Sequence, residues 1–494
     1  MNEELNPKES QQTEPQSAVP KGKVGMKGAA LIQFGSRYAS MGIQILLQMI
    51  LARLISPEDF GLWTIINVFA AFFQLFSDMG IGAAIVQFRD LTEKEFGSLF
   101  GFTILLGVIM SAIFCGCAYP ISMFYHDGRL AGACCFVAVS LFFNVLNMVP
   151  NGIMLRELRF RSIGIRTIVS ALLSATVAIV FARFGFGYNA LIFQVVAQSV
   201  VLFLWNIASR PIRHINFHFM KTLRRIFSYS IYQFGANMVN YFSRNLDNLL
   251  IPKVLGTAEL GYYDKSYKLT TYPLSAFSTV IASVIQPYMA KHQDEPEVIF
   301  KYWLKIEKFL SLIAAVLVTV CLTCSNEIIV ICYGSRWVPA VPAFSVLAIS
   351  VYSQMMSNPS GAFFQSIGRT DLMFRTMIVN TLMSVTGLAV GLKIGTLYSV
   401  SVGIAVAFTA HLLTVLYYLV KRGFGQSFAQ LKIFVPEILL AAAASAVSLF
   451  VARFLPENLR LGFGVKLAID LSILVAGYAV LGQFKYLKLI KRRK

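Results

Sequence analysis

The sequence predicts an all-α protein that crosses a membrane about fourteen times, as two parallel repeats of six helices followed by two extra C-terminal helices. Three observations predict this fold class. The 494-residue chain is 56% hydrophobic and only 14% charged, and its mean hydropathy is +0.66. Long apolar runs recur along nearly the whole chain, and the first part of the pattern returns 200 residues later. Such a composition is typical of a multi-pass membrane protein.

Each apolar run contains about 20 residues, which is enough to cross a bilayer as a helix. The loops between the runs are short, so no separate extramembrane domain is expected. The expected spans are 30–53, 61–86, 97–121, 131–153, 166–184, 188–207, 228–252, 266–288, 306–325, 341–366, 375–395, 398–420, 434–454 and 464–484.

The spans divide the chain into five expected parts. The polar, Gln- and Pro-containing start has no early apolar core, so it predicts a disordered tail and not a cleaved signal peptide. The parts are a cytoplasmic tail at 1–28, a first lobe at 29–210, an amphipathic cytoplasmic linker at 211–227, a second lobe at 228–424, and helices 13 and 14 with a basic tail at 425–494. The linker is expected either as a surface helix at the lipid headgroups or as an ordinary loop.

The distribution of basic residues predicts the orientation. With a cytoplasmic N-terminus, the inside segments carry 29 Lys and Arg residues and the outside loops carry 11, while Arg37, Arg244 and Lys308 fall within helices. Cytoplasmic segments are enriched in Lys and Arg. Both termini are therefore expected on the cytoplasmic side, and the net charge of +19 reflects topology, not a nucleic-acid partner.

An internal repeat underlies the two lobes. The stretch 33–61 aligns without a gap on 233–261, both copies open with the triplet QFG, and Gly61 falls on Gly261. A constant offset across matching apolar patterns indicates a structural repeat. Because six helices separate the copies, both enter the membrane from the same side, and the axis that relates them runs along the membrane normal.

Each copy is an apolar helix with one polar stripe, whose residues recur at steps of three and four. An Arg or Asp turned toward lipid costs about 2.5–3.5 kcal/mol. Both stripes are therefore expected to face a shared wet interior. They comprise Gln33, Arg37, Ser40, Gln44 and Gln48 in the first copy, and Gln233, Asn237, Asn240, Tyr241, Arg244, Asp247 and Asn248 in the second.

Cysteine and histidine give no metal signature. The pair Cys321 and Cys324 has metal-ligand spacing but no second pair and no nearby His, so helix packing is the expected role. A disulfide between the second and third hairpins stays open at this point. The five His residues are scattered, and of these only His411 falls within an expected span.

Several stretches resemble bacterial polysaccharide flippases, and the seventh-helix motif is the most specific of them. These proteins form the polysaccharide transport family of the multidrug/oligosaccharidyl-lipid/polysaccharide exporter superfamily, and the pattern is most similar to the colanic acid and teichuronic acid exporter branch. The resemblance covers about residues 30 to 425. The matching stretches are NYFSRNLDNLLI at 240–251, VLG at 254–256, ELGY at 259–262, LARLISPEDFG at 51–61, SDMG at 77–80 and RELRFR at 156–161.

The resemblance implies two lobes around a cavity that opens alternately to each side of the bacterial cytoplasmic (inner) membrane. The implied cargo is an undecaprenyl-pyrophosphate-linked oligosaccharide, carried by a monomeric transporter that is not an enzyme and has no cofactor. Membrane lipids, a polysaccharide polymerase and glycosyltransferases are the other implied partners. The expected site residues are Arg37 and Arg244 for the pyrophosphate, Gln44, Gln48, Asn237, Asn240, Tyr241 and Asn248 for the sugars and cavity, and Asp247 for a coupling ion or proton.

Each charged candidate also has a plainer interpretation. Arg244 and Asp247 lie three residues apart and are able to neutralise each other on one helix. Arg37 lies near a helix end, from which it is able to snorkel to the interface. Lys265 and Lys268 open the eighth span, as either a phosphate exit site or a solvated helix end.

Three other functions compete with polysaccharide transport. A peptidoglycan-precursor flippase would share the architecture and differ in its sugar cargo. A drug or cation antiporter needs a titratable carboxylate in the lobe core, whereas helix 1 has none and the stripes carry Arg. A polysaccharide polymerase or ligase typically has a long outer loop with catalytic Arg or His, and the sequence contains no such loop.

Overall fold

The computed structural model describes residues 26–78, 81–88, 90–220, 222–224, 238, 241, 244–289, 295–452 and 459–482. Within these ranges the chain is helical almost throughout and contains no strand. The first half forms α1 (Met26–Leu54), α2 (Pro57–Asp78), α3 (Ile81–Gln87), α4 (Glu93–Tyr125), α5 (Arg129–Leu146), α6 (Met148–Arg156), α7 (Phe160–Arg183) and α8 (Tyr188–Ser209).

The second half repeats the pattern and adds the last two helices. A helical segment at 244–254 precedes the labelled elements. These are α10 (Thr257–Met289), α11 (Pro296–Thr323), α12 (Ser325–Tyr333), η2 (Ser335–Ala340), α13 (Val341–Ser357), α14 (Ser360–Ser366), α15 (Thr370–Ile394), α16 (Leu397–Leu416), η3 (Tyr417–Gly423), η4 (Phe428–Phe434), α17 (Val435–Ala452) and α18 (Leu459–Val480).

Local sequence signals set the ends of the long helices, as α4 illustrates. The Thr92 side chain accepts a hydrogen bond from the Glu95 N–H, and the Glu95 carboxylate accepts one from the Thr92 N–H at 2.8 Å. This capping box satisfies two backbone donors that have no partner within the helix. The helix ends at His126, whose φ of 56° is left-handed and cannot continue the helix. The apolar run between these two signals becomes one long helix.

Ten helices of the described chain are long and apolar enough to cross a membrane. Three of the other four expected spans coincide with α1, with α2 followed by α3, and with α10. The span expected at 228–252 lies largely outside the described residues. The prediction of an all-α, multi-pass membrane protein is confirmed.

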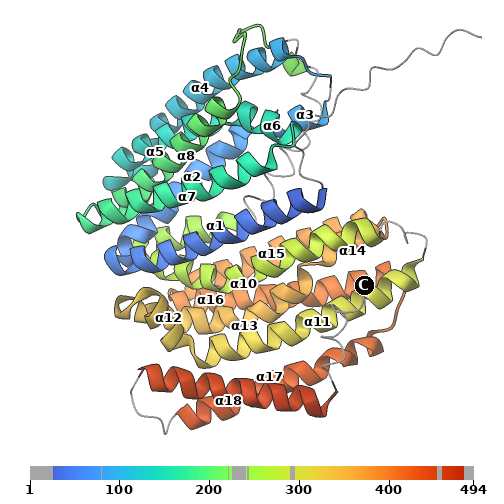
Figure 1. Ribbon diagram of the computed structural model, residues 1–494. Helices are drawn as coiled ribbons and strands as arrows, with labels where there is room; N and C mark the ends of the chain where they lie inside the picture. The colour runs from blue at the N-terminus through green and yellow to red at the C-terminus, as the bar shows by residue number, and fades with distance from the viewer. Residues whose placement is uncertain are drawn as a thin grey trace, which may run out of the picture.

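The helices pack into two lobes with matching internal contacts (Figure 1). In the first lobe α4 packs on α5, α2 on α5, and α7 on α8. In the second lobe the equivalent elements pair in the same way, with α11 on α13, α10 on α13, and α15 on α16. This correspondence is the structural form of the repeat, and it confirms the two-lobe architecture predicted from the offset of 200 residues.

Helices α17 and α18 form a separate layer against α11 of the second lobe (Figure 1). Buried polar contacts attach this layer. Lys308 of α11 forms an ion pair with Glu437 of α17, and neither side chain is exposed. Lys466 of α18 lies 2.6 Å from Glu327 of α12. The two extra helices are thus joined to the second lobe by paired charges as well as by apolar packing.

The linker is extended where it follows α8, and it contains no helix over 211–219. It lies against α4, where two glycines permit close approach of the backbones. A Cβ on Gly97 would lie 2.2 Å from the His214 carbonyl oxygen, and one on Gly101 would lie 2.2 Å from that of Asn216. Close backbone packing on α4 holds residues 211–219 in this extended form, whereas residues 220 and 222–224 are helical and the rest of the expected linker lies outside the described residues.

Candidate functional site between the lobes

The polar stripe of α1 contacts the second lobe at Gln48. Gln48 is partly buried, and its side-chain oxygen accepts a hydrogen bond from the Lys265 ammonium of α10. Gln44 and Arg37 precede Gln48 by about one turn and about three turns of helix, so they share its face. Both of these side chains are exposed. The first-copy candidates therefore lie along the side of α1 that looks toward the other lobe.

The second-copy stripe makes the reverse contact, from the second lobe to the first. The Tyr241 hydroxyl donates to the Val68 carbonyl oxygen of α2, and the Tyr241 ring lies 6.0 Å from the Phe72 ring. Arg244 lies one turn further along and is exposed. Asn237 and Asn240 lie outside the described residues. In the described part of the chain, no hydrogen bond or ion pair joins Arg244 to another candidate residue.

Asp247 is not paired with Arg244 in this structure. Its carboxylate accepts a hydrogen bond from the Tyr263 hydroxyl at 2.7 Å and another from the Asn248 N–H at 2.8 Å. Tyr263 belongs to α10 and is fully buried. The carboxylate thus points toward α10 while Arg244 remains exposed, so the two residues do not neutralise each other. Asn248 contributes its backbone here.

The two lobes touch at the end where α1 gives way to α2, through residues 53–61 and 253–265, which we call the lobe junction. At its centre the repeat-equivalent glycines lie against each other's helix. A Cβ on Gly61 would lie 1.8 Å from the Thr257 carbonyl oxygen, and one on Gly261 would lie 2.0 Å from that of Pro57. Because Thr257 is itself the equivalent of Pro57, the crossing is two-fold symmetric. Only glycine lets the backbones approach this closely.

Basic residues reach across the lobe junction on both sides of this crossing. Arg53 of the first lobe donates to the Ile331 carbonyl oxygen of α12 at 2.6 Å. Lys253, which the offset of 200 makes its equivalent, donates to the Phe124 carbonyl oxygen of α4 and lies 4.6 Å from the Phe124 ring centroid. Each lobe therefore extends one cation to a helix end of the other.

A further basic contact braces the same end of the first lobe. Arg129, at the start of α5, lies 2.5 Å from Glu58 and 2.7 Å from Asp127. The guanidinium lowers the pKa of the Asp127 carboxyl, because its hydrogen bonds favour the charged form. The start of α2, which carries half of the junction, is in this way tied to the turn between α4 and α5.

Lys265 lies inside the lobe junction and is completely buried. Besides Gln48, its ammonium faces the Phe60 ring, whose centroid is 3.7 Å away, and the Tyr333 ring, whose centroid is 5.6 Å away. Lys268, by contrast, is 38% exposed and pairs with Asp264 at 2.7 Å. The interpretation as a solvated helix end is therefore wrong for Lys265, because the first lobe covers it.

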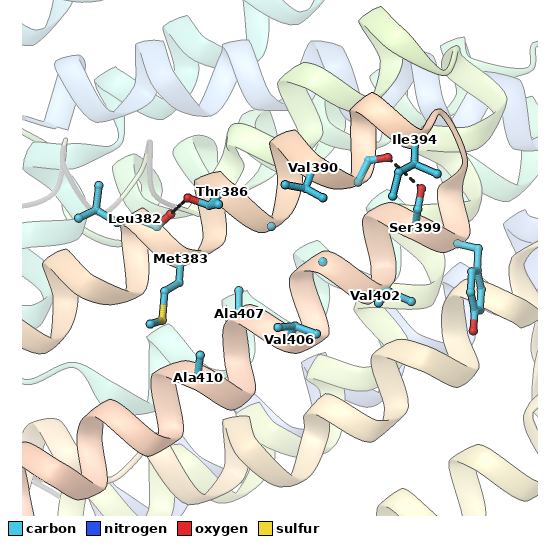
Figure 2. Close-up of a pocket in the computed structure, with 14 residues that line it drawn as sticks. Leu382, Met383, Thr386, Val390, Ile394, Ser399, Val402, Val406, Ala407 and Ala410 are labelled. Carbon is cyan, nitrogen blue, oxygen red and sulfur yellow. Dashed lines mark hydrogen bonds between the residues drawn. The ribbon is translucent and has the colours of Figure 1, made fainter.

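An apolar groove runs between α15 and α16, with a volume of about 740 Å³ (Figure 2). Leu382, Met383 and Val390 line one wall, and Val402 and Val406 line the other. The Thr386 and Ser399 hydroxyls donate to the backbone carbonyls of Leu382 and Gly391, and the surface left open is mostly hydrocarbon. Such walls suit an alkyl or prenyl chain and no polar ligand.

The described residues contain no group of three or more His, Cys, Asp and Glu side chains that is placed to hold a metal ion. All seven cysteines are free in the structure, including Cys321 and Cys324. The candidate site therefore consists of amide, hydroxyl, aromatic and cationic groups between two lobes. Cationic and amide groups of this kind are suited to binding a polar, anionic molecule.

Sequence reasoning placed the stripes but missed the junction. The signal was present, because the offset that equates Gly61 with Gly261 also equates Arg53 with Lys253. A glycine at both equivalent positions, each one turn after a helix start, is what a two-fold crossing of backbones requires. No sequence signal showed that Gln48 and Lys265 would be partners.

Comparisons with known proteins agree with this architecture. The profile of a family described as polysaccharide biosynthesis protein matches residues 50–342. The chain is 26% identical to the teichuronic acid biosynthesis protein TuaB of Bacillus subtilis (strain 168), over 69% of this chain and 73% of that protein. It is 23% identical to the lipopolysaccharide biosynthesis protein WzxC of Escherichia coli (strain K12), over 79% of this chain and 80% of that one.

A solved structure of the lipid II flippase MurJ in an inward closed conformation has a similar fold. Its TM-score is 0.71 at 14% sequence identity, and the match covers 93% of this chain and 99% of that one. At this identity the likeness concerns the fold alone. The family profile spans more than half of the chain, from within α1 through both halves of the lobe junction to the start of α13. The protein therefore belongs to the polysaccharide biosynthesis protein family of multi-pass membrane proteins.

Proposed function

We propose that the protein moves an undecaprenyl-pyrophosphate-linked oligosaccharide across the bacterial cytoplasmic membrane by alternating access, for the biosynthesis of a cell-surface polysaccharide. Membership of the polysaccharide biosynthesis protein family supports the class of cargo. The lobe junction supports the mechanism, since the two lobes meet across one end through contacts that a rocking motion would break. The cargo needs a cation for its diphosphate, polar groups for its sugars and an apolar path for its tail.

One observation carries the proposal: Arg37 of α1 and Arg244 of the helical segment 244–254 are exposed side chains on the two copies of the repeat. Facing lipid, each would cost about 2.5–3.5 kcal/mol. On α1 the same face reaches Lys265 of the other lobe through Gln48, so it looks into the space between lobes. Guanidinium groups bind phosphate oxygens in a bidentate fork, and these two are the cations proposed to meet the diphosphate.

The orientation of the transport cycle follows from the charge bias of the loops. With both termini in the cytoplasm, the lobe junction lies at the outer face of the membrane, and the closed junction corresponds to a state open to the cytoplasm. In this state the diphosphate would enter from the inner leaflet and meet Arg37 and Arg244. Parting of the lobes at the junction would then release the cargo outward.

The test is a substitution series at Arg244. We expect Arg244→Ala to abolish translocation, measured as lipid-linked oligosaccharide accumulating on the inner leaflet, with the protein level unchanged. Arg244→Lys should retain part of the activity, since it keeps the charge and loses the fork. Arg183→Ala at the end of α7 is the matched control, because it removes an Arg from the helix that α1 packs on and from outside the proposed site. Full activity of Arg244→Ala would remove this residue from the site.

A further inference from the structure

The lobe junction contains a buried cation that has no carboxylate partner among the residues that the structure describes. Lys265 is 0% exposed, and its ammonium contacts one amide oxygen, from Gln48, and two aromatic faces. The adjacent acid, Asp264, is engaged by Lys268 at 2.7 Å. Lys308, a second fully buried lysine, pairs instead with the carboxylate of Glu437. An ammonium has three donors, and a single amide oxygen accepts from one of them and carries no negative charge to balance Lys265.

The groups that cover Lys265 come mainly from the other lobe. Gln48 belongs to α1 and Phe60 to α2, whereas Lys265 and Tyr333 belong to the second lobe. Gly61 follows Phe60 directly and forms the backbone crossing with Thr257. Parting the lobes at this point therefore removes the amide and the nearer aromatic face together. Lys265 is left on the second lobe, facing the opening as a cation without a counter-ion.

We propose that Lys265 is an anion site that forms only when the lobe junction opens, and that it takes the phosphate-bearing headgroup of the lipid-linked cargo. In the closed state Gln48 and Phe60 contact the ammonium, and in the open state the anion takes their place beside it. This inference rests on the proposed function for the identity of the cargo. It adds a second phosphate contact at the exit, separate from Arg37 and Arg244. This contact becomes available only when the lobe junction opens.

Competition between two partners gives the site a thermodynamic role. Because the anion binds only the open state, its binding shifts the equilibrium toward that state. The size of the shift equals the difference between the binding free energies of the anion for the open and closed states. Opening in turn creates the affinity for the anion, and the two effects are reciprocal. Lys265 therefore links the arrival of the headgroup to the opening of the junction.

The test measures junction opening directly in the full-length protein, with its seven cysteines replaced. Spin labels at Phe184 and Ile394, both exposed and at the same end of opposite lobes, report the distance between the lobes. The protein is placed in phosphatidylethanolamine nanodiscs that contain undecaprenyl pyrophosphate, or phosphatidylglycerol, or neither. A fourth sample receives soluble inorganic pyrophosphate. We expect the undecaprenyl pyrophosphate sample to populate a longer distance in a saturable way, and phosphatidylglycerol to do so much less.

Two substitutions are expected to act in opposite directions. Lys265→Met keeps the bulk and removes the charge, and should raise the half-saturating concentration of undecaprenyl pyrophosphate about tenfold or more, since a hydrogen bond to a charged group contributes about 1.5–3 kcal/mol. Gln48→Leu removes the closed-state partner and leaves the cation, so it should lower that concentration. Arg336→Gln, a charge removal at an exposed position of the same end, should leave it unchanged.

The opposite signs separate the proposal from a purely structural role, in which both variants would weaken the junction alike. The assignment of Lys265 would be overturned by any of three results. Lys265→Met could respond to undecaprenyl pyrophosphate as the wild type does, both variants could shift the half-saturating concentration equally, or phosphatidylglycerol could lengthen the distance as much as undecaprenyl pyrophosphate does. These outcomes are independent of the proposed function, which the inner-leaflet assay tests. If wild type moved no lipid-linked saccharide in that assay, the response of Lys265 to inorganic pyrophosphate would still be measurable.

Discussion

At the scale of single residues, two ion pairs of the second lobe join helices that are far apart in the sequence. Lys308 meets Glu437, and Lys466 meets Glu327, so α17 and α18 are held to α11 and α12 by opposite charges. A buried pair is costly to break because the remaining charge has no partner, although replacing both residues by apolar ones is often harmless. Lys265 is buried by groups of the other lobe and not by an acid, and for this reason we assign it the switching role.

Replacing one member of the Lys308 pair is expected to destabilise the protein. Lys308→Met strands the Glu437 carboxyl in a fully buried position and should cost about 3–5 kcal/mol of unfolding free energy. The double variant Lys308→Met with Glu437→Leu should recover most of the loss. Thermal unfolding of the purified protein measures both changes. Lys305→Met is the control, because Lys305 lies on the same helix and is exposed. An unchanged melting temperature for Lys308→Met would contradict this account.

Asp247 is our proposed carrier of a coupling ion or proton. Its contact with Tyr263 ties it to α10, which carries half of the lobe junction. If an ion gradient drives transport, Asp247→Asn should abolish gradient-dependent translocation while cargo binding persists. Uptake into proteoliposomes with and without an imposed proton gradient separates the two steps, with Asp264→Asn as a nearby acid control. Transport by Asp247→Asn at the wild-type rate would leave the acid only a structural role beside Tyr263.

At the scale of elements, the crossing of α2 and α10 depends on two glycines related by the repeat. Gly61→Val and Gly261→Val should each prevent closure of the lobe junction, because even a Cβ would lie about 2 Å from a backbone oxygen of the other helix. The same spin-label pair should report a longer distance for both variants without any cargo. Gly116→Val on α4 is the control, since nothing lies within 4 Å of a Cβ there. Closed-state distances in both junction variants would show that the helices shift to make room.

At the scale of the whole molecule, the charge bias predicts that both termini and the loop before α17 are cytoplasmic. A single cysteine introduced at Ser427 in a cysteine-free background should resist a membrane-impermeant reagent added to intact cells, and it should react after the membrane is opened. A cysteine at Phe184 should react from outside, because it lies at the junction end of the first lobe. Labelling of the Ser427 position from outside would reverse the proposed orientation and place the junction in the cytoplasm.

The sequence by itself determined the all-helical, multi-pass class and the relation between the lobes. Each span is encoded locally, because about 20 apolar residues satisfy the length of the bilayer core whatever the neighbours are. The stripe positions of Arg37, Gln44 and Gln48 follow equally from helical periodicity. The offset of 200 residues predicted the repeat, and the family resemblance drawn from the 240–262 motif was confirmed by the family profile.

Only the tertiary structure decided which partner each polar group takes. Asp247 contacts Tyr263 and not Arg244, Gln48 contacts Lys265, and Lys308 contacts a helix more than a hundred residues away. The reason is physical: periodicity states which face of a helix is polar, but the partner depends on the rotation and depth of the neighbouring helix. Those are set by side-chain packing and by close contacts such as the glycine crossing, which no local pattern encodes.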